Sequence, residues 1–284
     1  MEYGFVAIAV LMFSVQFLLN DKYQKENGTG IVSSFTLNAV GATVGIISLS
    51  IISGFDFSIT WFTLICAILS AVIVIGFNLF SLKALEKVNL SVYSLFSMLG
   101  GMMLPTIVGI IFYNEGVTLS KIICVALIIL ALSMTVGGQK NKGGTFYYLS
   151  VFVLNGAIGV VSKFFSSAPY DKVSSATYSF WIAVVSLVIS LTVLFIVRKQ
   201  FKKPSLKAVL YSAGGGLLNR IGNYLVLLAL LVLPASIQSP LTTGGVIIAS
   251  TIISAIAGQK PTEKEVLSVI ISFVGIMSLI FIPI

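Results

Sequence analysis

Ten apolar stretches, each about twenty residues long, follow one another along the chain with short polar segments between them. A helix of this length spans the hydrocarbon core of a bilayer. The stretches cover about 3–20, 31–53, 60–82, 89–113, 118–137, 145–165, 175–197, 205–230, 234–257 and 263–283. Only 9% of the residues are charged and the mean hydropathy is +1.08, whereas about a quarter of the residues in a soluble domain are charged. We therefore expect an all-α integral membrane protein with ten transmembrane helices.

The chain resembles itself at an offset of 145 residues. Between Asn78 and Gly100, seven of 23 positions are identical in the second copy, where chance would give about two. The matches include Asn78 with Asn223 and Gly100 with Gly245. Each copy holds five expected helices, and an odd number gives the two copies opposite orientations in the membrane. The predicted units are a first five-helix repeat at 1–137, a cytoplasmic linker at 138–144 and a second, inverted repeat at 145–284.

Basic residues are concentrated on alternate loops. Thirteen of the seventeen Lys and Arg residues follow the first, third, fifth, seventh and ninth stretches. The positive-inside rule therefore places both termini on the extracytoplasmic side of a plasma (inner) membrane. Because Glu2 stands where a signal peptide has basic residues, we expect the first stretch to be a membrane span. The basic loops act as topology signals next to the lipid bilayer, and we expect no nucleic-acid partner.

Several motifs accompany this ten-helix pattern. Asn155-Gly156 precedes Lys163 by a few residues, and Pro105 precedes Glu115 near the end of a span. With the helix count and repeat length, they resemble the drug/metabolite transporter superfamily in its EamA-like form. The first motif is similar to the Trp-Gly…Lys pattern of that family, with Asn155 in place of the tryptophan. The resemblance implies a secondary transporter.

Arg220 is the most unusual residue, because it lies about fifteen residues into its span. A cation at that depth costs a few kcal/mol or more and needs a partner. The planar guanidinium is suited to a carboxylate or phosphate. No Asp or Glu is expected at the same depth, so the partner is either an anionic group of the substrate or a set of carbonyl or headgroup oxygens. Both alternatives remain open from the sequence.

Other polar side chains are expected near the membrane midplane, where an amide or hydroxyl either binds a neighbouring helix or faces a cavity. The substrate-binding candidates are Arg220, Gln16, Asn155, Tyr93, Ser97, Thr242 and Thr243. The repeat-related Asn78 and Asn223 are predicted to belong to the inner and outer gates respectively. Two glycines and two prolines at corresponding helices are predicted hinge positions, because proline removes a helix hydrogen bond. These positions are Gly100, Gly245, Pro105 and Pro240.

These residues predict a secondary transporter of a small polar metabolite, such as an amino acid or another carboxylate-bearing solute, working by alternating access. The alternatives are a nucleobase or cationic-drug exporter and, from another class, a non-transporting membrane scaffold or sensor. An enzyme is not expected, since the spans hold no cluster of His, Cys or acidic residues. We expect no cofactor and no metal, and a monomer or homodimer.

Overall fold

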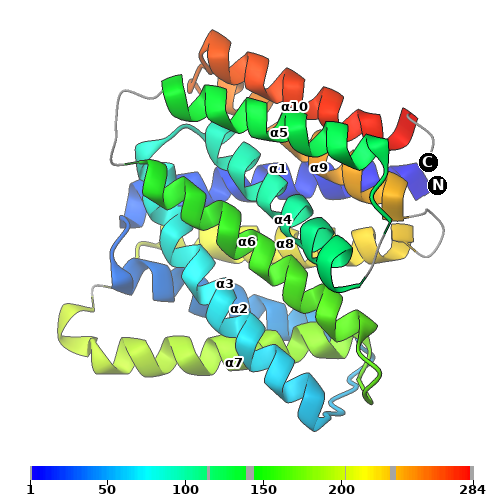
Figure 1. Cartoon of the computed structure of the whole chain (residues 1–284). Helices are drawn as coiled ribbons and strands as arrows, with labels where there is room; N and C mark the ends of the chain where they lie inside the picture. The colour runs from blue at the N-terminus through cyan, green and yellow to red at the C-terminus, as the bar shows by residue number, and fades with distance from the viewer. Residues whose placement is uncertain (1, 114–115, 139–143, 202, 231–234, 282–284) are drawn as a thin grey trace.

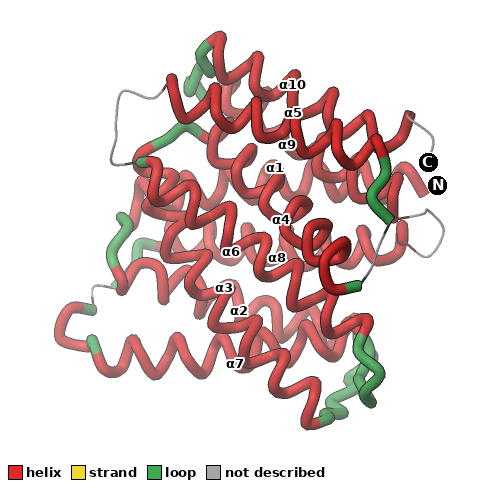
Figure 2. Tube along the Cα trace, viewed as in Figure 1, coloured by secondary structure: helices red, strands yellow, loops and turns green. Residues whose placement is uncertain are grey.

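The computed structural model describes residues 2–113, 116–138, 144–201, 203–230 and 235–281. Glu115 and most of the linker at 138–144 therefore lie outside the described residues. Within the described ranges the protein is helical and has no strand (Figure 2). The helices are α1 (Glu2–Asn27), α2 (Ile31–Ile52), α3 (Trp61–Lys87), α4 (Leu90–Phe112), α5 (Leu119–Gly138), α6 (Thr145–Ser167), α7 (Ser175–Ile196), α8 (Leu206–Leu230), α9 (Ala235–Ile256) and α10 (Glu263–Phe281).

Most helix ends agree with the predicted ends within a few residues, but α1 and α3 are longer. The predicted spans end at 20 and 82, whereas the helices end at Asn27 and Lys87. Hydropathy marks where the apolar run stops, and the polar residues that follow continue the helix because they are adequate helix formers. Gly28 ends α1 with a φ of 78°, a left-handed conformation that glycine adopts without strain. A short 3₁₀ helix at Arg198–Gln200, absent from the prediction, follows α7.

Eight helices surround the centre of the bundle, and α5 and α10 pack side by side at one edge (Figure 1). α1 packs against α8 and α9, and α6 packs against α3 and α4. α2 packs against α7 and α8, and α3 also packs against α7. The first residue of α1 and the last of α10 lie at the same end of the bundle. Six described helices are long and apolar enough to cross a membrane.

Glycines allow two pairs of helices to approach closely. A Cβ on Gly216 of α8 would lie 2.8 Å from the Cα of Gly41 in α2. A Cβ on Gly100 of α4 would overlap the carbonyl group of Phe152 in α6. Neither space accommodates a side chain, so the backbones themselves are in contact, as small residues permit in membrane bundles.

The loops at 53–60 and 168–174 are bound together at the end of the bundle where the termini lie. Thr60 Oγ1 donates to the backbone oxygen of Asp171 at 2.9 Å, and Trp181 Nε1 donates to that of Ser58 at 2.9 Å. Thr177 Oγ1 donates to Asp56 Oδ2 at 2.9 Å. Hydrogen bonds from Ser58 and Thr177 lower the pKa of the Asp56 carboxyl below its ordinary value.

Candidate functional site

A cavity of about 580 Å³ lies in the middle of the bundle. Described residues from α1, α2, α3, α4, α6, α7, α8 and α9 line it, whereas no described side chain of α5 or α10 does. The volume is in the range of small-molecule binding sites. The cavity extends to Ile52, Ser166 and Ser175, which border the two outer loops. It therefore runs from the centre toward the end of the bundle that carries the termini.

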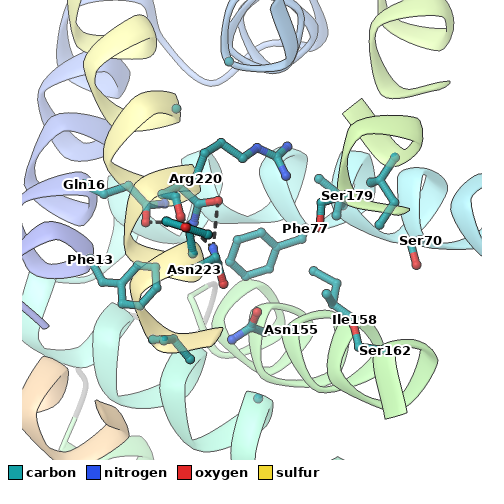
Figure 3. A pocket seen from close by; sticks show the side chains of 18 of the residues that line it. Phe13, Gln16, Ser70, Phe77, Asn155, Ile158, Ser162, Ser179, Arg220 and Asn223 are labelled. Carbon is teal, nitrogen blue, oxygen red and sulfur yellow. Dashed lines mark hydrogen bonds between the residues drawn. The ribbon is translucent and has the colours of Figure 1, made fainter. Parts of the chain in front are cut away.

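Arg220 lies in the wall of this cavity, fourteen residues or about 21 Å along α8. Its guanidinium extends from α8 across the cavity (Figure 3). Its Nε lies 3.0 Å from the point where a Cβ on Gly45 would stand, so the missing side chain of Gly45 makes room for it. Within the described ranges, Arg220 has no hydrogen bond and no ion pair. It is also the one charged side chain among the described residues that line the cavity.

Three amides form a chain beside Arg220. Asn223 Nδ2 donates to the backbone oxygen of Asn219 at 2.7 Å and to its Oδ1 at 3.3 Å. Asn219 Nδ2 donates to Gln16 Oε1 at 3.1 Å, which joins α8 to α1. All three side chains line the cavity, and Figure 3 shows Gln16 and Asn223 among them. The chain fixes the orientation of each amide, because each donor meets an oxygen that can only accept.

Two further asparagines line the cavity from α6 and α3. Asn155 Nδ2 donates to the backbone oxygen of Ser97 in α4 at 2.6 Å. Asn78 Nδ2 donates to Asn38 Oδ1 at 2.9 Å, and Asn38 Nδ2 donates to Ser190 Oγ at 2.7 Å. These bonds join α6 to α4 and α3 to α2 and α7. The cavity wall is therefore held in place by amide groups that also face the cavity.

The α9 side of the cavity is lined by Gln238, Thr242 and Thr243. Gln238 Nε2 donates to Thr242 Oγ1 at 2.8 Å, and that hydroxyl donates to the backbone oxygen of Gln238 at 3.0 Å. Thr242 is thus satisfied within its own helix. Six of the seven predicted substrate-binding residues line this one cavity. They are Arg220, Gln16, Asn155, Ser97, Thr242 and Thr243.

Tyr93 is the predicted binding residue that does not line the cavity. Its side chain is fully buried, its hydroxyl donates to Ser81 Oγ at 3.1 Å, and its ring packs edge-on against Phe17 at 5.1 Å. Phe17 does line the cavity. Tyr93 therefore stands behind the wall and supports it.

The predicted gate residues line the cavity, whereas three of the predicted hinge residues lie at contacts between helices. Asn78 and Asn223 both line the cavity. Gly100 and Pro105 lie at the contact of α4 with α6, because a Cβ on Gly159 would lie 2.5 Å from Pro105. A Cβ on Gly245 in α9 would lie 2.8 Å from a methyl group of Val10 in α1. Pro240 lies within α9, and its side chain is outside the described part.

The opposite end of the bundle is closed below the cavity. A buried apolar cluster lies there, formed by Tyr23, Leu37, Leu82, Ala208 and the partly buried Tyr211. Asp21 is 2% exposed, and its Oδ2 accepts hydrogen bonds from Lys25 Nζ at 2.6 Å and Gln259 Nε2 at 2.8 Å. Gln259 Oε1 in turn accepts from the backbone N–H of Leu90 at 3.0 Å. The loop after α9 is thereby bound to α1 and α4.

Sequence reasoning missed Asn20, Asn38, Asn219 and Gln238, all of which line the cavity. One signal could have found three of them, because polar residues four positions apart share a helix face. Such pairs in the sequence are Gln16 with Asn20, Asn219 with Asn223 and Gln238 with Thr242. The helices that carry the predicted binding and gate residues all line the cavity, and they are α1, α3, α4, α6, α8 and α9. Residues of α2 and α7 complete the lining.

Apolar helices around a polar cavity of solute size define a multi-pass membrane protein that can hold a small molecule. Residues 142–281 match the EamA-like transporter family, which confirms the resemblance to the drug/metabolite transporter superfamily. The second half of the chain is therefore an EamA-like domain, and the protein is a membrane transporter of small solutes. No curated protein matches the chain. Among the solved structures that the chain resembles, a crystal structure matches with a TM-score of 0.61 and 13% identity over 96% of this chain and 94% of that chain, which shows that the two share a fold.

Proposed function

We propose that the protein is a secondary transporter of a small metabolite with a carboxylate group, such as an amino acid, and that it works by alternating access. The observation that supports this proposal is the guanidinium of Arg220, which lines the cavity without a protein partner among the described residues. A cation without a counter-ion at this depth is costly. A solute carboxylate would supply the partner through two parallel hydrogen bonds.

Alternating access requires two halves that can exchange conformations, and the helix packing supports inverted repeats. If α1 to α5 correspond to α6 to α10, the contact of α1 with α8 corresponds to that of α6 with α3. In the same way, α1 with α9 corresponds to α6 with α4, and α2 with α8 corresponds to α7 with α3. Each of these pairs is in contact. We propose that the two five-helix units are structural repeats related by a pseudo-twofold axis in the membrane plane.

We assign the structure to a state of the transport cycle from the end of the bundle to which the cavity extends. It reaches the end of the bundle that holds the termini, and the Tyr23 cluster closes the other end. The basic loops lie at the closed end, which we assign to the cytoplasm. The structure then corresponds to an outward-facing state in the plasma membrane with both termini extracytoplasmic. The direction of net transport in the cell, which we propose to be export or exchange, is set by solute gradients.

The predicted gate and hinge roles remain proposals of the same kind. Asn78 joins α3 to α2, whereas Asn223 bonds within its own helix. Loss of the Asn78 bond is expected to loosen the packing of α3 against α2, and loss of the Asn223 bond is expected to change only the cavity wall. We propose that α4 and α6 move as one unit, because their backbones are in contact at Gly100.

A nucleobase or cationic-drug exporter is the second candidate within transport. The aromatic rings of Phe13, Phe77 and Tyr224 in the cavity wall favour it. The absence of a carboxylate among the lining residues weakens it for cations, since a bound cation would meet the positive charge of Arg220. A scaffold or sensor would produce no solute flux in proteoliposomes, and that measurement separates it from both transporters.

The experiment that tests the proposal is a thermal-stability screen of the purified protein against amino acids, deaminated carboxylic acids, nucleobases and cationic drugs. A ligand that binds the folded state raises the Tm. We expect the Tm to rise with carboxylate-bearing solutes, and Arg220→Gln to abolish that rise. A rise with cationic drugs that persists in Arg220→Gln would contradict the proposal.

A further inference from the structure

Three asparagines in the cavity wall share one orientation, which their hydrogen bonds determine. Asn155 meets the backbone oxygen of Ser97, and Asn223 meets the backbone oxygen of Asn219. A carbonyl oxygen accepts and never donates, so each asparagine must turn its N–H₂ group toward it. The side-chain oxygen of each amide is then directed away from that bond.

The orientation of the Asn78 amide is also determined by hydrogen bonds, through its neighbour Asn38. Asn38 Nδ2 donates to Ser190 Oγ and approaches the backbone oxygen of Ser186 at 3.5 Å. This orientation places Asn38 Oδ1 next to Asn78, which must donate to it through Nδ2. The Oδ1 atom of Asn78 therefore takes no part in its hydrogen bond with Asn38.

The result is a set of three acceptors in the wall of one cavity that no described residue uses. No residue in the described part of the chain donates a hydrogen bond to the Oδ1 atoms of Asn78, Asn155 or Asn223. All three side chains line the same cavity. In Figure 3 the oxygens of Asn155 and Asn223 point toward the space between the two residues, and Phe77 also lines the cavity. An amide oxygen in a membrane site needs a donor to replace the hydrogen bonds of water.

A primary ammonium group has the complementary chemistry. It presents three N–H donors and no acceptor, which matches three amide oxygens. The ring of Phe77 can add the attraction of an aromatic face for a cation. Amide oxygens are neutral, so they bind an ammonium without also cancelling the positive charge of Arg220.

We propose that Asn78, Asn155 and Asn223 form a subsite for the primary ammonium group of the solute. This inference rests on the proposed function, in which Arg220 holds the carboxylate of the same solute. The cavity then has a donor region at Arg220 and an acceptor region at the three asparagines. Its substrates are zwitterionic amino acids, and carboxylic acids without an amine bind more weakly.

The test measures binding of matched compounds by calorimetry on the purified protein. Leucine, phenylalanine, methionine and threonine are each compared with the deaminated acid of the same carbon skeleton and with the amide that blocks the carboxylate. Loss of one hydrogen bond to a charged group weakens binding about tenfold or more. We expect the free amino acid to bind at least that much more tightly than its deaminated acid.

Two substitutions localise the effect. Asn155→Ala and Asn223→Ala are each expected to weaken binding of the amino acid about tenfold and to change binding of the deaminated acid by less than about twofold. Asn223 is exposed to the cavity, so its variant is expected to fold. Asn223→Asp, which adds a negative charge, should strengthen binding of the amino-acid amide and weaken that of the deaminated acid. Ser179→Ala is the control, because this cavity hydroxyl already donates to the backbone oxygen of Ser175.

The outcomes separate the subsite from the proposed function. Equal binding of amino acids and deaminated acids, unchanged in both alanine variants and lost in Arg220→Gln, would overturn the ammonium subsite and leave the carboxylate site standing. Tight binding of the amides with none of the free amino acids or deaminated acids would overturn the proposed function itself. No binding of any form to the folded wild-type protein would overturn both.

Discussion

Arg220 and Gly45 face each other across the contact of α8 with α2, and the guanidinium Nε occupies the space that a side chain at position 45 would need. A Cβ there would lie 3.0 Å from Nε and 3.6 Å from the Cβ of Ala183. The position of the charge in the cavity therefore depends on a glycine in a neighbouring helix.

Replacing Gly45 by alanine is expected to displace the guanidinium and weaken solute binding. Alanine is a better helix former than glycine by about 1 kcal/mol, so the Tm should not fall. We expect the affinity for a carboxylate-bearing solute to fall about tenfold, as when one charged hydrogen bond is lost. Gly41→Ala is the matched control, since a Cβ there lies 3.9 Å from the nearest atom and does not approach Arg220. Equal losses of affinity in the two variants would contradict the steric explanation.

The repeat-related glycines Gly100 and Gly245 are expected to respond differently to alanine. At Gly100 the new methyl group meets the backbone of Phe152, which cannot move without separating α4 from α6. We expect a loss of about 2 kcal/mol in the free energy of unfolding, typical of overpacking. At Gly245 it meets only side-chain atoms of Val10, which can shift at a lower cost than a backbone, and the gain in helix propensity offsets part of the contact. Unfolding by denaturant in lipid measures both, and a larger loss at Gly245 would refute this reading.

Gln259→Leu is expected to open the inner end of the cavity more often. The substitution removes the bonds to Asp21 and to the backbone N–H of Leu90. A loss of about 1 kcal/mol shifts a two-state equilibrium about fivefold. A cysteine at position 212, deep in the cavity, should then react about five times faster with an impermeant thiol reagent applied from the inner face. Lys264→Ala is the control at the same end, and equal rates in both variants would show that these bonds do not close the cavity.

The Asp56 carboxylate is expected to make stability depend on pH. Its hydrogen bonds with Ser58 and Thr177 lower its pKa below the ordinary 3.8. A lowered pKa in the folded state contributes stability above the unfolded pKa, and this contribution is lost as the pH falls through the folded value. The Tm of Asp56→Asn should therefore lie below that of the wild type at neutral pH, and the difference should shrink below about pH 4. A difference that grows on acidification would contradict the assignment.

The sequence carried enough information to predict the number of helices in the described part, most helix ends and the position of Arg220, because a membrane imposes length and polarity on every span. Hydropathy could not show that α1 continues to Asn27, since it marks only where the apolar run stops.

The side-chain contacts between helices could not be predicted from the sequence. Tyr93 shares a helix face with cavity residues, but its hydroxyl is bound to Ser81 instead. The orientation of Asn155 depends on a backbone oxygen 58 positions away, which no local pattern reveals.

Flux through proteoliposomes measures whether the protein transports an amino acid and whether transport requires Arg220. Wild-type protein, Arg220→Lys and Arg220→Gln are compared for exchange of labelled leucine against internal unlabelled leucine, with Ser179→Ala as the control. We expect rapid exchange by the wild type and by Ser179→Ala, and no exchange by Arg220→Gln. Arg220→Lys keeps the charge but not the planar fork, so we expect a reduced rate. Exchange by Arg220→Gln at the wild-type rate would contradict the proposed role of Arg220.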